Sequence, residues 1–248
     1  MILAVDTSIG STAAVVDPDG VVLGHSESAS PRGHAEVIGD LLVAALEDAG
    51  VSADEITHVA TGMGPGPFTG LRIGIAAGRA FAVGRGIGVM PVVSHDAAAL
   101  AHIERTDDGG AFAIVTDARR RENAVSVYRG LDAHGLPFRL SGPELHPQTA
   151  DLAAILPSAT VIVPTGTARP AAATGTASGA LDAAASSPGA TAEDSNAAEA
   201  PTSIIRAADL GRIAARTLAA GVAPAADEPL YLRSPDVTVG HVRKRVST

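Results

Sequence analysis

The sequence predicts an α/β protein in which short apolar strands alternate with helices. Brief apolar runs bounded by turn residues recur along the chain, which is typical of buried strands. Between them, apolar side chains return at helical spacing, most clearly in residues 35–49. A Gly- and Pro-rich loop leads into a helix of small residues in the first half, and a second group of strands begins near residue 111.

The elements follow in order along the chain. In the first half we expect strands over 2–5, 12–16, 21–24 and 57–61, a strand or extended link over 86–93, and helices over 35–49, 69–83 and 94–103. In the second half we expect strands over 111–116, 124–128 and 161–163, and helices over 152–156 and 204–220.

Residues 167–202 differ sharply in composition from the rest of the chain. They are mostly Ala, Ser, Thr, Gly and Pro, with one Leu and no aromatic residue. Such a stretch buries too little apolar surface to offset its ordering entropy. We therefore predict a disordered insertion there, and a flexible tail over 235–248. The remaining chain divides into an N-terminal domain, 1–105, and a smaller C-terminal domain, 106–234.

Composition excludes several classes of site. With 46% hydrophobic and only 2% aromatic residues, the core must consist of aliphatic side chains. The absence of Cys excludes disulfides and thiolate chemistry, and Lys244, the only lysine, lies near the C-terminus. The N-terminus has no signal-peptide pattern, and no run of about 18 apolar residues predicts a membrane span. We expect a cytoplasmic protein.

The net charge of −9 disfavours strong, autonomous binding of nucleic acid, which usually needs a basic face. A local exception is the run Arg119–Arg121. Beside it, Asp117 and Arg119 fit two interpretations equally well: a brace within a hairpin turn, or a surface for a partner.

Asp6, Thr7 and Ser8 end the first predicted strand and begin a hairpin. Hydroxyls, backbone amides and a carboxylate in this place fit a phosphate loop, in which the acid works with a metal ion. The same three residues are also ordinary turn formers.

The segment GPGPFTGLRIG, residues 64–74, is more specific. Its glycines and prolines shape a loop, and Thr69 is placed to cap the next helix. Glycines inside that helix cost roughly 1 kcal/mol each relative to alanine, so they indicate close packing. The packing is either internal or against another subunit.

The histidines predict no metal site, because none of the eight forms an i,i+4 pair. His34, at the start of a predicted helix, is more often a structural hydrogen-bonding group than a ligand. His95 and Asp96 are adjacent on a helix and point in different directions, so we do not expect a catalytic dyad.

Six segments together resemble the TsaB family, also called YeaZ. They are ILAVDTS at 2–8, RGHAEVI at 32–38, GPGPFTGLRIG at 64–74, VSHDAAALA at 93–101, DARR at 117–120 and EPLYLR at 228–233. Their order and spacing agree over nearly the whole chain. Pro67 stands where the family more often has Ser, and the insertion at 167–202 replaces a short connection.

The resemblance implies the actin/Hsp70/sugar-kinase fold, with two ribonuclease-H-like lobes of which the second is reduced. It implies a non-catalytic subunit that activates TsaD, the catalytic subunit that places threonylcarbamoyl on adenosine 37 of ANN-decoding tRNAs. A TsaE-type ATPase joins the complex, tRNA is reached only through it, and the chain alone forms a homodimer. No tightly bound cofactor is implied, although a nucleotide at the subunit interface is left open.

On this interpretation Asp6, Thr7 and Ser8 form a vestigial phosphate loop. The family's interface is a helical bundle, which helices 35–49 and 69–83 would supply. Within it we expect partner contacts from Pro65, Phe68, Leu71, Gly74, Ile75 and Gly78. Two alternatives are an independent ATP-using enzyme of the kinase type and a zinc peptidase, but the sequence lacks a second phosphate loop for the first and spaced metal ligands for the second.

Overall fold

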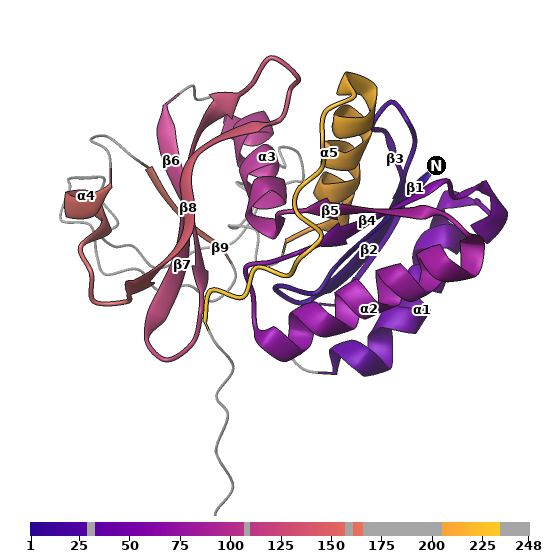
Figure 1. Ribbon diagram of the computed structural model, residues 1–248, viewed down its shortest axis with the longest axis horizontal. Coiled ribbons are helices and arrows are strands. Elements are labelled where there is room, and N and C mark those ends of the chain that lie inside the picture. Colours follow the sequence, from indigo (N-terminus) through magenta and orange to yellow (C-terminus); the bar gives the residue numbers. More distant parts are fainter. Residues whose placement is uncertain (29–32, 107–109, 157–160, 166–204, 234–248) are drawn as a thin grey trace, which may run out of the picture.

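A computed structural model describes residues 1–28, 33–106, 110–156, 161–165 and 205–233, which form two β-sheets with helices against their faces (Figure 1). The first sheet has the order β3-β2-β1-β4-β5. Its strands are β1 (Ile2–Asp6), β2 (Ser11–Val16), β3 (Val22–Ser28), β4 (His58–Gly62) and β5 (Gly88–Val92). The pairs β1–β2 and β2–β3 are antiparallel, whereas β1–β4 and β4–β5 are parallel.

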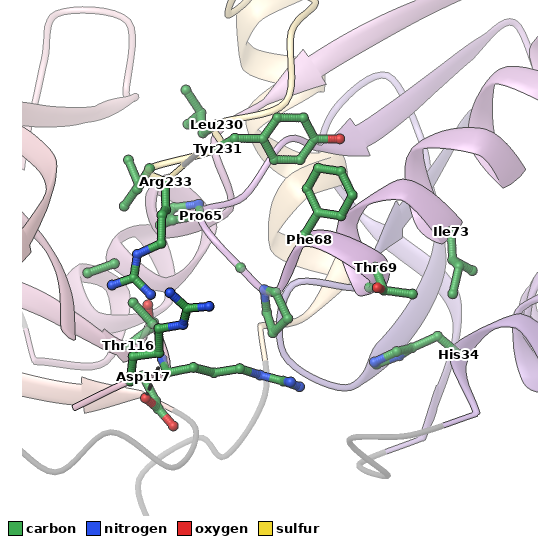
Figure 2. A pocket seen from close by; sticks show the side chains of 18 of the residues that line it. His34, Pro65, Phe68, Thr69, Ile73, Thr116, Asp117, Leu230, Tyr231 and Arg233 are labelled. Atoms are coloured by element: carbon green, nitrogen blue, oxygen red, sulfur yellow. Dashed lines mark hydrogen bonds between the residues drawn. The ribbon is translucent and has the colours of Figure 1, made fainter. Parts of the chain in front are cut away.

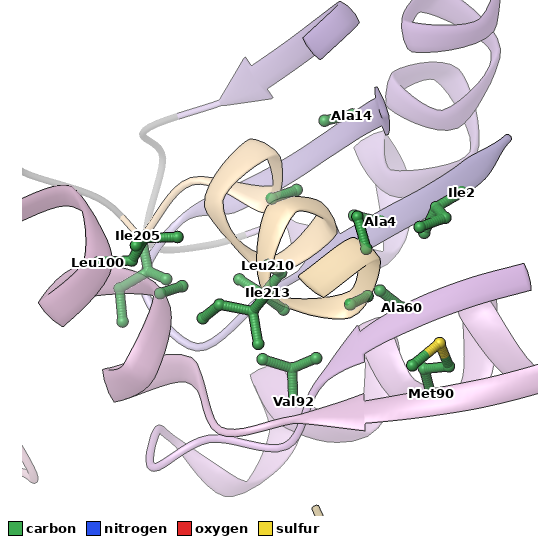
Figure 3. Close-up of a cluster of buried hydrophobic side chains, with 14 residues drawn as sticks. Ile2, Ala4, Ala14, Ala60, Met90, Val92, Leu100, Ile205, Leu210 and Ile213 are labelled. Atoms are coloured by element: carbon green, nitrogen blue, oxygen red, sulfur yellow. The ribbon is translucent and has the colours of Figure 1, made fainter. Parts of the chain in front are cut away.

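Helices cover both faces of this sheet. Helices α1 (His34–Ala49) and α2 (Phe68–Arg85) pack on one face, and α5 (Ala207–Ala220) packs on the other. Along β1, Leu3 therefore belongs to the cluster under α1, while Ile2 and Ala4 belong to the cluster under α5 (Figure 3). A strand buried on both faces is apolar throughout, which is why the run Ile2–Val5 shows no alternation.

The second sheet has the order β8-β7-β6-β9. Its strands are β6 (Ala111–Asp117), β7 (Glu122–Leu131), β8 (Pro137–Pro147) and β9 (Val161–Thr165). Antiparallel β6–β7 and β7–β8 pairs and a parallel β6–β9 pair repeat the arrangement of β1 to β4. Two ribonuclease-H-like lobes, the second with fewer strands in the described part, confirm the predicted fold class.

The helices between the sheets cross from one lobe to the other. Helix α3 (Ser94–Thr106) follows the first sheet in sequence but packs on β6, β7 and β8, and it also contacts α5. Conversely, α5 follows the second sheet and packs on the first. The domain boundary at residue 105 stays a prediction. It separates the strands of the two sheets, but α5 follows it in sequence and packs on the first sheet.

Strand β8 was not predicted. Its sequence, PFRLSGPELHP, contains three prolines and a glycine, which argue against a strand in the middle of a sheet. Because β8 is an edge strand, its prolines need not donate to a second neighbour. The remaining short elements are a 3₁₀ turn, Ala53–Glu55, and α4 (Leu152–Ile155), which packs under the second sheet through Leu152.

The insertion predicted over 167–202 and the tail over 235–248 lie outside the described residues. Among the helices that the structure describes, none is both long enough and apolar enough to cross a bilayer.

Candidate functional site between the lobes

Asp6 ends β1 in a fully enclosed position. Its Oδ1 accepts hydrogen bonds from the backbone N–H of Ser8, at 2.8 Å, and from the Ser8 hydroxyl. Its Oδ2 accepts from the Ser94 hydroxyl at 2.6 Å. Burial raises the pKa of Asp6, against the opposing effect of these hydrogen bonds. The carboxylate is thus held by the protein's own donors.

The hydroxyls beside Asp6 are also used internally. Thr7 donates from Oγ1 to the carbonyl of Gly70, at 2.7 Å, and accepts from the N–H of Gly74, at 3.1 Å. A Cβ on Gly66 would lie 2.8 Å from Cα of Ser8, so the Gly–Pro loop sits directly on the Asp6–Ser8 turn. All three side chains of the predicted phosphate loop are buried, and the loop's polar atoms face protein partners.

The glycines of α2 serve the packing of this helix inside the chain. A Cβ on Gly74 would lie 2.3 Å from Thr7 Oγ1, and one on Gly78 would lie 2.3 Å from Thr61 Cγ2. The helix therefore approaches β1 and β4 closely, which is the internal alternative that the sequence left open. It begins at Phe68, so Thr69 lies in its first turn and does not cap it.

This packing corrects the expected partner contacts. Leu71 and Ile75 join Met63 in a buried cluster, at 0% and 4% exposure, and Gly74 and Gly78 are equally enclosed. These four residues face the core, so they cannot be surface contacts. Of the six expected residues, Pro65 is buried at the edge of a cavity and Phe68 is partly exposed there.

The outward face of α1 and α2 carries small and apolar side chains among charged ones such as Asp40, Glu47 and Arg72. Val43 of α1 and Val83 of α2 are 54% and 81% exposed. Ala76 and Ala80, which lie between the start of α2 and Val83, are also exposed. The two helices pack side by side, so these residues lie on one helical layer (Figure 1).

A cavity of about 800 Å³, which we call the interlobe cavity, lies where the two lobes meet. Four segments form most of its wall, to which β8 adds Leu145 (Figure 2). They are the start of α1 with His34, the loop and first turn of α2 with Phe68, the β6–β7 hairpin with Asp117, and residues 230–233. His34 accepts or donates a hydrogen bond at Nδ1 with the Ser11 hydroxyl, at 2.7 Å, which is the structural role expected for it.

The β6–β7 hairpin presents Arg119 and Arg120 to this cavity. Arg119, Arg120 and Arg121 have φ angles of 63°, 51° and 62°, a left-handed conformation that costs non-glycine residues roughly 1–3 kcal/mol each. Hydrogen bonds hold it: Arg119 N–H donates to Asp117 Oδ1, and Gln148 N–H donates to the Arg121 carbonyl. Asp117 thus braces the turn through the backbone of Arg119.

The segment 227–233 crosses the cavity from one lobe to the other. Leu230 N–H donates to the Met63 carbonyl at 2.8 Å, and Arg79 pairs with Asp227. The ring of Tyr231 lies 4.7 Å from that of Phe68, and Arg72 donates to the Tyr231 hydroxyl. Beyond them, Arg233 forms an ion pair with Glu122 of β7. We call this segment the C-terminal strap.

A buried polar group joins the start of α3 to the second lobe. His95 contacts the Ser126 hydroxyl at 2.8 Å through Nδ1 and the Thr116 hydroxyl at 2.9 Å through Nε2. Burial, and then the charge of Arg139, lower the pKa of His95 to about 3, so the ring is neutral. Asp96 instead accepts from the Tyr128 hydroxyl, which confirms that His95 and Asp96 do not form a dyad.

The sequence did not reveal the cavity. The segments EPLYLR and DARR stood out by resemblance, but nothing local indicated that the strap and the hairpin meet at the start of α2. Among the described residues, no three His, Cys, Asp or Glu side chains gather as metal ligands would. The predicted absence of a metal site stays a prediction.

Comparison with known proteins gives partial matches in sequence. Residues 22–135 match the family described as TsaD, tRNA N6-adenosine threonylcarbamoyltransferase. An uncharacterized protein of Mycobacterium tuberculosis is 42% identical over 123 residues, covering 49% of this chain and 56% of the relative. The chain thus spans little more than half the length of such relatives. The Escherichia coli tRNA threonylcarbamoyladenosine biosynthesis protein TsaB is 39% identical over 83 residues, covering 34% of this chain and 36% of that protein.

Two solved structures match nearly the whole chain. An uncharacterized Pseudomonas aeruginosa protein, described as similar to peptidase YeaZ, aligns with a TM-score of 0.69 and 24% identity, covering 94% of this chain and 99% of that one. YeaZ from Pseudomonas aeruginosa aligns with a TM-score of 0.65 and 21% identity, covering 93% and 99%. At this identity the two structures show the fold alone.

Proposed function

We propose, from the match of residues 22–135 to the TsaD family and from the partial match to a TsaB protein, that the chain is a non-catalytic subunit that supports a TsaD-type enzyme. In this role it acts as scaffold and activator in the modification of adenosine 37 of ANN-decoding tRNAs by threonylcarbamoyl. A TsaE-type ATPase belongs to the same complex, which is cytoplasmic.

The observation that carries this proposal is the closed Asp6–Ser8 turn. A phosphate loop that works needs hydroxyls and amides free to face a phosphate, and a carboxylate free to act with a metal ion. Here Asp6, Thr7 and Ser8 are at most 2% exposed, and their side chains are hydrogen-bonded to other groups of the protein. This arrangement supports a subunit that kept the fold without the phosphate chemistry, and it disfavours the kinase-type alternative.

The outward face of α1 and α2 is the surface we assign to the TsaD-type partner. Its small side chains, Ala76 and Ala80, allow another helix to approach, and the exposed Val43 and Val83 offer apolar area to bury. Because the partner would share the fold, the same face would join two copies of this chain when the partner is absent.

Co-purification with a TsaD-type protein of the same organism, followed by a transfer assay with and without this chain, tests the proposal. We expect no transfer by the chain alone, and stimulation when both are present. Stoichiometric zinc in the purified chain would favour the peptidase alternative, and tight ATP binding in calorimetry would favour the kinase alternative. Transfer without the TsaD-type protein would refute the non-catalytic role.

The surface assignment has its own test. Val83→Glu places a charge on the outward face of α2 without touching the core, so it should abolish association while leaving the thermal unfolding of the chain unchanged. Val21→Glu is the matched control, since Val21 is 55% exposed in the turn between β2 and β3. If the Val83 variant associates as well as the control, the partner binds elsewhere.

A further inference from the structure

Aromatic side chains are scarce in this protein, and two of them meet at the interlobe cavity. The sequence has 2 Tyr, 4 Phe and no Trp. Phe68 and Tyr231 both line the cavity and both remain partly exposed (Figure 2). Arg72 lies 4.0 Å from the centre of the Phe68 ring and donates to the Tyr231 hydroxyl. A partly exposed pair of rings with an arginine against it is a surface on which a nucleobase can stack.

Positive charge gathers on the other side of the same cavity. Arg119 and Arg120 line it and are exposed, although the whole chain has a net charge of −9. The hydrogen-bonded, left-handed turn fixes the backbone of both residues. Burial lowers the pKa of His34, and the charge of Arg119 lowers it further. Since both residues line the cavity, this second effect indicates a positive potential there. Exposed guanidinium groups of this kind bind phosphate oxygens.

Two carboxylates, Glu36 and Asp117, also line the cavity and offset part of this charge. Asp117 accepts from the Arg119 N–H, at 2.8 Å, and from the Gln148 side chain, so it is held within the hairpin. Glu36 lies exposed in the first turn of α1. The volume of about 800 Å³ falls within the range of roughly 300–1,000 Å³ that small-ligand sites occupy.

We propose that the interlobe cavity receives an unpaired nucleotide of RNA, with its base against Tyr231 and Phe68 and its phosphate at Arg119. This inference rests on the proposed function, because it makes the subunit a direct contact for the RNA that the complex modifies. Arg119 is exposed, so the RNA backbone on either side of this phosphate would lie in solvent. The Asp6–Ser8 turn is closed by its own hydrogen bonds, so it provides no binding site for the triphosphate of a free nucleotide.

The affinity of this contact alone is low, because a chain with a net charge of −9 repels a polyanion. We expect a Kd on the order of 10⁻⁴ M at about 50 mM salt, as for weak backbone-driven binding. Within the complex, the contact adds to those made by the partner subunit.

The test is fluorescence anisotropy of a labelled RNA stem–loop titrated with the full chain. Arg119→Glu should weaken binding about tenfold and lower the salt slope by about 1, because one phosphate contact becomes a repulsion. The matched control is Arg129→Glu, which changes the net charge equally. Arg129 is exposed at the opposite end of the same hairpin, where it pairs with Ala111. It should weaken binding less than about twofold.

A second pair of variants tests the rings. Tyr231→Ala should weaken binding about tenfold, since stacking of one base contributes about 1–3 kcal/mol, and Tyr231→Phe should bind as the wild type does. Urea unfolding of each variant confirms that it is folded under the assay conditions.

Several results would overturn the inference. These are equal effects of Arg119→Glu and Arg129→Glu, binding that does not saturate at about 10⁻³ M chain, and equal competition by a fully paired RNA duplex. Displacement by ATP at a similar concentration would assign the cavity to a free nucleotide instead. None of these measurements needs the TsaD-type partner, so failed co-purification would count against the proposed function and leave this result standing.

Discussion

The carboxylate of Asp6 accepts a hydrogen bond from the hydroxyl of Ser94 at 2.6 Å, between residues 88 positions apart in the sequence. The same hydroxyl accepts from the N–H of Gly64 at 3.0 Å. Ser94 therefore joins the end of β1, the Gly–Pro loop and the start of α3. The Asp6 carboxylate is thus part of the packing that holds these three segments together.

Asp6→Asn tests this structural role. Since burial raises the folded pKa of Asp6 above its unfolded value of 3.8, the native state binds a proton first as pH falls. Wild-type protein should therefore gain stability relative to Asp6→Asn as pH falls from neutral towards 3.8, by about 1.4 kcal/mol for each unit of the shift. Urea unfolding of both proteins at several pH values measures the difference.

The same variant separates a scaffold from an enzyme. A working phosphate loop loses activity when its carboxylate becomes an amide, whereas a scaffold that stays folded keeps its effect. Asp6→Asn should therefore stimulate a TsaD-type partner as the wild type does. Loss of stimulation by a folded, associating variant would mean that Asp6 still does chemistry.

His95 gives the opposite dependence on pH. Its folded pKa of about 3 lies below the unfolded value of 6.5, so its contribution is complete above pH 6.5 and declines as pH falls towards 3. Between pH 6.5 and 5 the wild type should lose about 2 kcal/mol relative to His95→Gln, whose side chain does not titrate. Denaturation curves at these two pH values measure the difference. Parallel curves for the two proteins would mean that the ring is protonated inside the fold.

Two glycines of the same helix should respond to alanine in opposite directions. Gly74→Ala places a Cβ 2.3 Å from Thr7 Oγ1 and disturbs the bond that the Gly74 N–H donates to it, so it should cost about 2–3 kcal/mol. Gly84 has nothing within 4 Å, and Gly84→Ala should stabilise the chain by about 0.5–1 kcal/mol. Thermal unfolding of both variants measures the contrast. Similar losses at both positions would contradict the close approach of α2 to β1.

The sequence predicted most helices and strands because their signals are local. Helical spacing located α1, and apolar runs located β1 and β6 to within two residues. Strand β8 was missed because its prolines are acceptable only at a sheet edge, and that place depends on the pairing of distant strands.

The candidate site was harder to predict than the fold for the same reason. The glycines of α2 were identified as close-packing positions, but whether they face the core or a partner depends on the position of Thr7 and Thr61. The interlobe cavity needs residues 33–36, 65–73, 116–124 and 230–233 in one place, and no periodicity encodes that meeting. The resemblance supplied the motifs, and the structure supplied their arrangement.

Tyr231 should stabilise the C-terminal strap through its ring more than through its hydroxyl. Tyr231→Ala removes the ring contact with Phe68 and should lower the free energy of unfolding by about 1–3 kcal/mol. Tyr231→Phe removes only the exposed hydrogen bond from Arg72 and should cost less than about 1 kcal/mol. Urea unfolding measures both losses. If the phenylalanine variant loses as much as the alanine variant, the strap is held by the hydrogen bond from Arg72, and the pair of rings contributes little to joining the lobes.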